Sequence, residues 1–378
     1  MKAAADRRGA DANGPAPVPA VYPAGLWKLS RLRAVLAGRA LTERPTPTTV
    51  TLELTPEIAA LHAAADSGID KVARLSAFFG TRSTPSRSDW LNVVAAVPAG
   101  GTLRLAGGDP LQSPHLETLI FEADRRGLEV EIVTPGARLE EYAPVIYGLG
   151  VALVRIRLDA RAGGAGKQND FDKAARGVMA LRALRDKAPK PALVVEVRLR
   201  AQTAGDAAEM ARRALATDAD KVVVCYPEYD DVKSRPEYIA AIEDLARARK
   251  DFPIARVRMF PDFTPLAAAR FYSGEAISAG PAGCAAPRGE TPRGETPRGE
   301  TPRGEAPRCD VPWREAFVGP DGRARLCSAV PLGDIRSEPL DGMFDGPNAR
   351  AFRRAMRKSF PPECARCIGR FARGRAVK

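Results

Sequence analysis

The chain has 378 residues, of which 45% are hydrophobic, and its formal net charge is +12. The hydrophobic share excludes a wholly disordered chain, and the length allows one large domain together with a small one. No basic patch interleaved with aromatic residues accompanies the charge, and no apolar run reaches about eighteen residues, so we expect neither a nucleic-acid partner nor a membrane span.

Residues 1–47 are predicted to form a disordered N-terminus followed by a lead-in helix. Residues 1–24 are rich in Ala, Pro and Gly, and residues 27–41 have the amphipathic pattern of a helix. The first residues, MKAAADRRGADANG, lack the apolar centre of a signal peptide. We therefore expect a cytoplasmic protein.

Residues 48–280 alternate between strand and helix patterns. Strands are predicted at 50–54, 71–79, 102–106, 130–134, 152–159, 192–200, 221–227 and 254–260. Between them run periodic helices, one of which covers 113–128 with Ser113 as its N-cap. Such an alternation indicates βαβ units and a parallel sheet, in the α/β class. Seven or eight units favour a full or partial (β/α) barrel over an open doubly wound sheet.

The carboxyl ends of barrel strands are where such folds carry their functional groups. The predicted ends are GGDP at 107–110, TPG at 134–136, Asp159, Arg198 with Arg200, and Cys225-Tyr226-Pro227. Asp159 either binds a ligand there or only begins a loop. Cys225 would point into the barrel mouth, although a buried structural thiol is the more frequent explanation for a lone cysteine.

Residues 281–308 are predicted to be a linker. They contain four tandem pentapeptides, PRGET three times and PRGEA once, at 287–306. Pro and Gly at this density, with balanced Arg and Glu, do not build a hydrophobic core. A five-residue period is also too short for a solenoid repeat.

Four of the six cysteines fall in the last seventy residues. Cys364 and Cys367 form a CxxC pair, a spacing at which two thiolates bind one metal centre. Cys309 and Cys327 flank the segment FVGPDGRARL, which is predicted to be a hairpin that brings them together. We interpret the four as ligands of a metal or iron–sulfur site, and leave zinc and iron–sulfur both open because four thiolates serve either. Cys284 is either a fifth ligand or a bystander.

These motifs together resemble the radical S-adenosylmethionine (SAM) enzymes that carry a C-terminal SPASM or twitch domain. The segment LRLAGGDPLQSPHLETLIFEADRRGLEVEIVTPG is similar to the family's third strand, its GGEP motif, and the helix and strand that follow. VALVRIRLDA is similar to its fifth strand. CDVPW, GPDGRARLC, GDI at 333–335 and the closing CxxC resemble a SPASM-type module, here 309–371, followed by a tail at 372–378. The resemblance implies one auxiliary [4Fe–4S] cluster on Cys309, Cys327, Cys364 and Cys367.

The chain departs from the family at the Cys-x3-Cys-x2-Cys motif whose thiolates hold the SAM-cleaving cluster. Ile58, His62 and Ala65 stand at the corresponding positions, and no cysteine lies within thirty residues of them. Ile and Ala do not ligate iron, and one His does not hold a [4Fe–4S] cluster. The resemblance therefore does not extend to reductive cleavage of SAM.

The resemblance also implies a ligand site at the GGDP turn. Gly107, Gly108, Asp109 and Pro110 match the motif that meets the SAM amino group, and Asp159 lies at another strand end. The same four residues also suit a plain strand-to-helix turn. Because the cluster that orients SAM is missing, we expect most of the affinity for SAM to be lost.

Three functional hypotheses remain open, and the sequence does not decide whether the chain is an enzyme. In the first, a catalytically degenerate iron–sulfur protein acts as a binding or partner subunit in a biosynthetic, peptide-modifying pathway. Its partner would be a peptide substrate or an active radical SAM paralogue. In the second, an enzyme uses the remaining cluster for redox or Lewis-acid chemistry, helped by Cys225 and Asp159. In the third, a zinc site stabilises a binding protein.

Overall fold

The computed structural model describes residues 46–55, 84–159, 165–185, 189–199, 207–226, 236–251, 256–273, 309, 311–327, 330–358, 364 and 367. The helix predicted at 27–41, the strand predicted at 71–79 and the pentapeptide repeats lie outside these residues. None of the helices within them combines the length and apolar character that a membrane-crossing segment needs.

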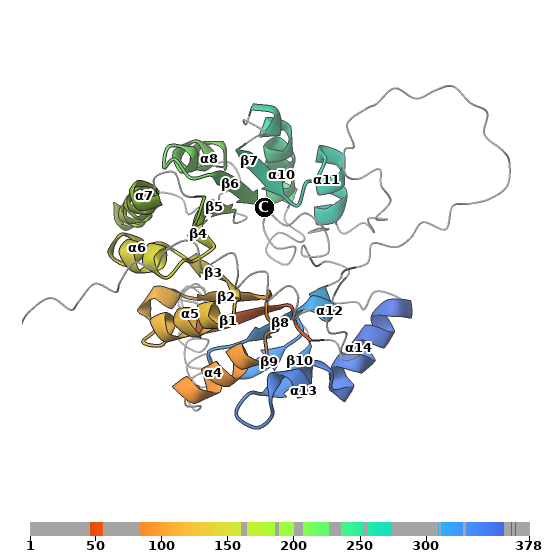
Figure 1. Cartoon of the computed structure of the whole chain (residues 1–378). Coiled ribbons are helices and arrows are strands. Elements are labelled where there is room, and N and C mark those ends of the chain that lie inside the picture. Colours follow the sequence, from red (N-terminus) through yellow and green to blue (C-terminus); the bar gives the residue numbers. More distant parts are fainter. Residues whose placement is uncertain are drawn as a thin grey trace, which may run out of the picture.

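One ten-stranded sheet organises the chain, in the order β10-β9-β8-β1-β2-β3-β4-β5-β6-β7 (Figure 1). Strands β1 to β7 are Thr49–Thr55, Thr102–Gly107, Glu129–Thr134, Leu153–Asp159, Ala192–Arg198, Lys221–Cys225 and Val257–Phe260. Each of them pairs in parallel with the next along the chain. Within the described residues, β7 and β10 are the two edges, so the sheet is not closed. The predicted parallel α/β fold is confirmed in its partial-barrel form.

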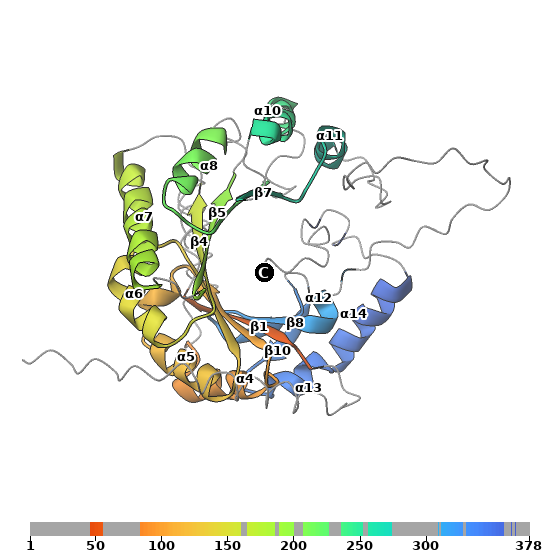
Figure 2. The same cartoon turned by 45° about the horizontal axis from the view of Figure 1, so that its top comes forward.

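Helices cover the outer face of the curved sheet, as Figure 2 shows. They are α4 (Arg87–Ala95), α5 (Leu116–Arg125), α6 (Leu139–Gly148), α7 (Ala165–Arg185), α8 (Ala207–Leu215), α10 (Pro236–Ala248) and α11 (Pro265–Ser273). Between α10 and β7 lies the 3-10 turn η3 (Arg249–Asp251). Strand side chains that point to the helices are fully buried, for example Val50 and Leu52 of β1. Because side chains alternate along a strand, the intervening residues face the inner side of the sheet.

The N-cap predicted for Ser113 is wrong. The chain first forms the 3-10 turn η1 (Pro110–Gln112), and the Ser113 N–H closes it by donating to the Pro110 carbonyl (3.0 Å). Helix α5 then begins at Leu116 with His115 as its N-cap residue, without a side-chain hydrogen bond at the cap. The capping pattern fails here because Asp109 and Pro110 begin a separate turn upstream.

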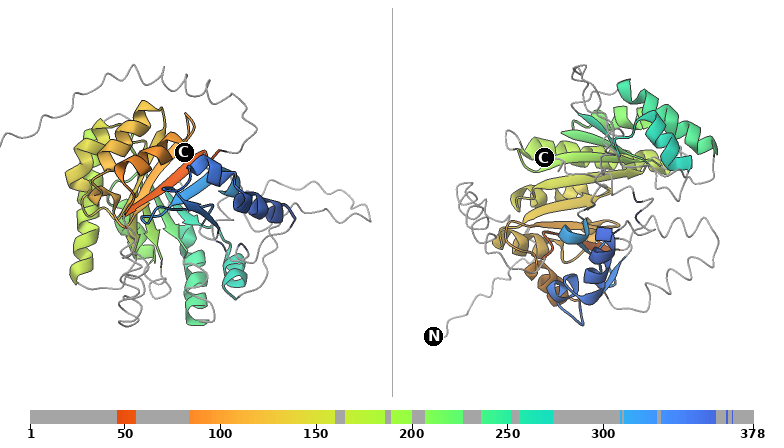
Figure 3. Two further views of the ribbon diagram at one scale, coloured as in Figure 1. Left: turned by 90° about the horizontal axis from the view of Figure 1, so that it is seen from below. Right: turned by 90° about the vertical axis from the view of Figure 1, so that its right-hand side faces the viewer.

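The C-terminal hairpin is confirmed, and it also extends the sheet. Strands β8 (Glu315–Val318) and β9 (Arg323–Arg325) are antiparallel, and β10 (Pro331–Asp334) pairs with β9. Strand β8 pairs in parallel with β1, so the cysteine-bearing region lies beside the first barrel strand (Figure 3). Helices α12 (Val311–Arg314), α13 (Leu340–Phe344) and α14 (Pro347–Lys358) accompany these three strands.

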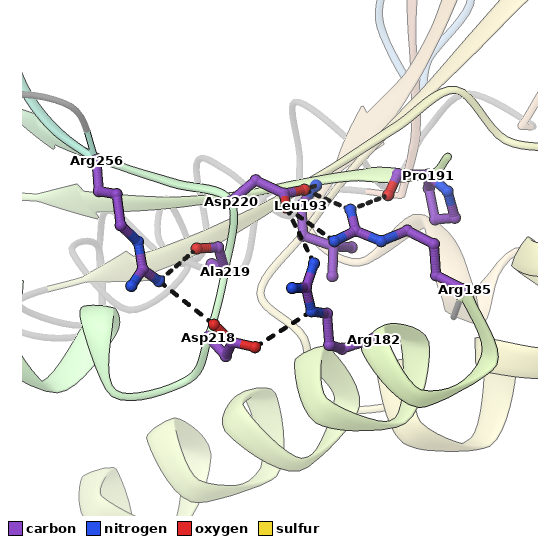
Figure 4. A network of polar contacts seen from close by, with 8 residues as sticks. All are labelled: Arg182, Arg185, Pro191, Leu193, Asp218, Ala219, Asp220 and Arg256. Carbon is purple, nitrogen blue, oxygen red and sulfur yellow. Dashed lines mark hydrogen bonds and ion pairs between the residues drawn. The ribbon is translucent and has the colours of Figure 1, made fainter. Parts of the chain in front are cut away.

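An ion-pair network joins the C-terminal end of α7 to the amino ends of β5 and β6 (Figure 4). The guanidinium of Arg185, 4% exposed, donates to both carboxylate oxygens of Asp220 and to the Pro191 carbonyl (3.0 Å). Asp220 also accepts the Leu193 N–H (2.8 Å). Because this network lies at the end of the strands opposite the GGDP turn, we interpret it as structural.

Candidate functional site

The GGDP turn joins the carboxyl ends of three neighbouring strands. The Gly108 N–H donates to the carbonyl of Thr55, the last residue of β1 (3.0 Å), and the Asp109 N–H donates to the Thr55 hydroxyl (2.9 Å). From the end of β3, the Thr134 hydroxyl donates to Asp109 Oδ1 (2.8 Å). The carboxyl ends of β1, β2 and β3 therefore meet at this turn.

The backbone conformation of Gly107 and the nearby backbone of Thr55 leave no room for a side chain at this position. Its φ is +110°, and a Cβ added there would lie 2.3 Å from the Thr55 carbonyl oxygen. A side chain at this position would therefore push the end of β1 away from β2. This close approach accounts for the glycine without any ligand.

Asp109 is a buried carboxylate, and only one of its two oxygens accepts hydrogen bonds from the described residues. Its side chain is 2% exposed, and Oδ1 accepts the Leu111 N–H (3.2 Å) as well as the Thr134 hydroxyl. Oδ2 is buried and has no hydrogen-bond partner among the described residues. Burial raises the pKa of Asp109, although the hydrogen bonds from Thr134 and Leu111 oppose the shift. Oδ1 therefore stabilises the turn, and Oδ2 remains as an acceptor for a cationic or N–H-bearing group.

The other predicted strand-end residues are less informative. Asp159 is the last residue of β4 and lies opposite Arg198 of β5 in the parallel register; its ligand role stays a prediction. Tyr226 is buried against Phe263, with ring centroids 5.6 Å apart. Arg200 and Pro227 lie outside the described residues.

Cys225 is a poor candidate for a nucleophile. It ends β6, and burial, helped by the charge of Glu196, raises the pKa of its thiol to about 12. The positive charges of Arg198, Arg157 and Arg155 lower this pKa only in part. Because the thiolate is the reactive form, the thiol is inert near neutral pH.

A ladder of ion pairs crosses the inner face of the sheet. Its members are Glu53, Arg104, Glu131, Arg155, Arg157, Glu196, Glu315 and Arg325. The shortest pairs are Arg104–Glu131 at 2.8 Å, Arg155–Glu196 at 3.0 Å and Arg325–Glu53 at 3.1 Å. These side chains are 15–37% exposed, so the inner face is polar and partly open to solvent.

This ladder was not predicted, although the sequence carries a signal for it. Charged residues alternate with apolar residues at 130–132, 154–158 and 195–198, and the apolar residues are buried in the core. The four arginines and four glutamates balance one another, and Glu131 and Glu315 raise the pKa of Arg104 although burial opposes this. A balanced polar face suits a ligand that itself carries both charges.

Of the four predicted metal ligands, Cys309, Cys327 and Cys364 are half-buried and Cys367 is exposed. Cys309 lies two residues before α12, Cys327 two residues after β9, and Cys364 and Cys367 follow α14. The Cys364 thiol contacts the Met356 thioether of α14 (3.7 Å), and the Cys367 N–H donates to the Cys364 carbonyl (3.3 Å).

Cys327 has an unusual backbone conformation. Its φ is +120°, a region that residues with a Cβ rarely adopt. Backbone strain of this kind is typical of positions where the side chain has a function. The observation favours a ligand role for this thiol.

Four thiols are the donors that iron–sulfur clusters take, so the donor set fits such a cluster chemically. Within the described part of the chain, no three His, Cys, Asp or Glu side chains converge in a way that would hold a metal ion. The ligand assignment to Cys309, Cys327, Cys364 and Cys367 thus stays a prediction.

Comparison with known families identifies the C-terminal region. Residues 309–368 match the model for SPASM, described as an iron–sulfur cluster-binding domain, and this span contains all four cysteines. Residues 287–308 match the model for the GETHR pentapeptide repeat, described as five copies. None of the curated proteins compared with the chain matches it.

Solved structures match the overall fold. Streptococcus suis SuiB is 10% identical with a TM-score of 0.51, and the match covers 86% of this chain and 72% of SuiB. SuiB bound to precursor peptide SuiA is 11% identical with a TM-score of 0.50, over 86% of this chain and 71% of that one. At these identities the likeness concerns the fold.

Proposed function

By its fold and its C-terminal domain the chain is a radical SAM/SPASM-type protein, and we propose that it keeps one auxiliary [4Fe–4S] cluster but does not cleave SAM. One observation carries the proposal. The segment that matches SPASM contains four cysteines, whereas the first 224 residues of the sequence contain no cysteine. The chain therefore supplies thiolates for one cluster and none for the cluster that would bind and cleave SAM.

Cys309, Cys327, Cys364 and Cys367 would hold this cluster, which supplies electron transfer when bound. The positive φ of Cys327 supports its part in the set. Because β8 pairs with β1, a cluster on this region would be attached to the same sheet that carries the ion-pair ladder.

We propose a partner role in a biosynthetic pathway, with a peptide as the ligand or substrate of the complex. A SuiB structure contains a bound precursor peptide, and the balanced charges of the inner face suit a polar peptide. An active radical SAM paralogue would be the protein partner. We also propose a cytoplasmic location, where thiols stay reduced and available as ligands.

Binding of SAM is proposed to be weak or lost. The close approach of Thr55 explains Gly107, and Asp109 is engaged by Thr134 and Leu111, so the GGDP turn has structural reasons for its sequence. Asp109 Oδ2, which has no hydrogen-bond partner among the described residues, is an acceptor left for the amino group of a ligand. Calorimetric titration of SAM into wild-type chain and into Asp109→Asn tests this.

An enzyme that relies on Cys225 is less well supported, because burial keeps that thiol protonated. A zinc site remains the alternative for the metal, since four thiolates also bind zinc. Colour separates the two, because a [4Fe–4S] protein is brown with absorbance near about 400 nm and a zinc protein is colourless.

The experiment uses the anaerobically purified full chain. We expect visible absorbance that is lost in Cys309→Ala and Cys364→Ala and retained in the matched control Cys225→Ala. Incubation with SAM and dithionite should yield no 5′-deoxyadenosine. A colourless protein would contradict the cluster, and 5′-deoxyadenosine from the pure chain would contradict the loss of SAM cleavage.

A further inference from the structure

Helix α14 carries a buried arginine that the proposed function does not yet use. Arg353 is 5% exposed, and its Nε donates to the Pro312 carbonyl of α12 (2.8 Å). Its guanidinium carbon lies 4.4 Å from the centre of the Phe344 ring of α13. The side chain therefore lies between α12, α13 and α14. Figure 1 shows these three helices close together in the C-terminal region.

Two nitrogen atoms of this guanidinium lack an acceptor in the part of the chain that the structure describes. Nη1 and Nη2 are buried and have no hydrogen-bond partner among the described residues. Leaving a buried charged donor unsatisfied is costly, and such groups are normally paired or bound to a ligand. Asp345, the acidic group whose charge acts on Arg353, forms its ion pair with Arg350 instead (3.6 Å). The buried positive charge is thus not neutralised within the described residues.

The surroundings of Arg353 point to the cysteines. Pro312, which accepts from its Nε, is three residues from Cys309. Met356, one helical turn along the same face of α14, contacts the Cys364 thiol at 3.7 Å. One helix face therefore carries both the unpaired guanidinium and the contact to the CxxC pair, and it also binds the segment that follows Cys309.

We infer that Arg353 is a positioning residue for the proposed cluster, to whose sulfur atoms its Nη1 and Nη2 donate hydrogen bonds. This inference rests on the proposed function, because it requires a cluster on Cys309, Cys327, Cys364 and Cys367. A cluster held by four thiolates is an anion, and hydrogen bonds and positive charge near its sulfurs favour the reduced, more negative state. The guanidinium presents several donors in a rigid fork, which an ammonium does not.

The test compares Arg353→Met and Arg353→Lys with the matched control Arg354→Met, an exposed arginine one position along the same helix. Iron per chain, the thermal midpoint and the reduction potential are measured for each full-length, cluster-loaded protein. For Arg353→Met we expect the reduced form to be disfavoured about tenfold, which is a potential about 59 mV more negative for one electron. Arg353→Lys should shift in the same direction by less, and Arg354→Met should match the wild type.

A purely structural role for Arg353 would lower the thermal midpoint and leave the potential unchanged. Equal potentials in Arg353→Met and Arg354→Met, with iron retained, would overturn the inference while leaving the proposed function intact. If Arg353→Met does not fold, Arg353→Lys decides, and an unchanged potential there overturns the inference. A wild-type chain without iron would instead overturn the proposed function, and this inference with it.

Discussion

Replacing Gly107 by Ala tests whether the end of β1 sets the conformation of the GGDP turn. The added Cβ would lie 2.3 Å from the Thr55 carbonyl oxygen and 2.9 Å from the Thr55 nitrogen, both backbone atoms. The φ of +110° adds strain of about 1–2 kcal/mol for a residue with a Cβ. Displacing the packed end of β1 adds about 1–3 kcal/mol, as overpacking typically does. We expect a total loss of about 2–5 kcal/mol in the free energy of unfolding.

Gly100 provides the matched control for Gly107. Its φ is +79°, but an added Cβ would meet nothing within 4 Å. Gly100→Ala should therefore show the conformational strain alone, about 1–2 kcal/mol. Urea denaturation of both variants in the same cluster-loaded state measures the difference. Equal losses in the two would refute the reasoning that Thr55 excludes a side chain at Gly107.

Three further predictions concern ionisable groups. Arg185→Met should lower the free energy of unfolding by about 2 kcal/mol because it removes the buried guanidinium that donates to the partly exposed Asp220. Arg176→Met, from an exposed pair, should cost under about 1 kcal/mol; equal losses in urea denaturation would contradict this. Burial raises the pKa of Asp220, but Arg185 and the Leu193 N–H together lower it by more, so the folded pKa lies below the unfolded pKa. The stabilisation that the ionised carboxylate gives the folded chain is therefore fully present above the unfolded pKa and is lost as pH falls through the folded pKa. The difference in stability between wild type and Asp220→Asn should therefore shrink below about pH 3.9, and a constant difference in denaturation from pH 7 to 3 would count against it. Burial raises the pKa of Asp109, so its ionised form lowers the stability of the folded chain above the unfolded pKa. Asp109→Asn should therefore be more stable than wild type in urea denaturation at pH 7, and this difference should disappear in acid. A variant less stable than wild type at pH 7 would contradict this.

Local patterns were sufficient for most of the sheet. The segments at 50–54, 102–106 and 130–134 are short runs in which apolar residues alternate with others, and each forms a strand within one residue of the prediction. The hairpin between Cys309 and Cys327 was predictable because Pro320-Asp321-Gly322 favours a turn. Such features depend on residues close in sequence.

Pairings between distant segments were not predictable in this way. Strand β8 lies beside β1, and the Thr48 hydroxyl donates to the Arg314 carbonyl (3.4 Å) across 266 residues of sequence. No local period records which strand becomes the neighbour of another. The burial of Arg353, among several arginines on a strongly basic helix, likewise depends on Pro312 and Phe344 from other helices. Burial of that side chain is therefore visible only in the folded chain.

The iron and acid-labile sulfide content of the anaerobically purified full chain tests the central claim most directly. Four thiolates on one [4Fe–4S] cluster predict about four iron and about four sulfide per chain. A chain that holds about one zinc ion and no sulfide would contradict the claim.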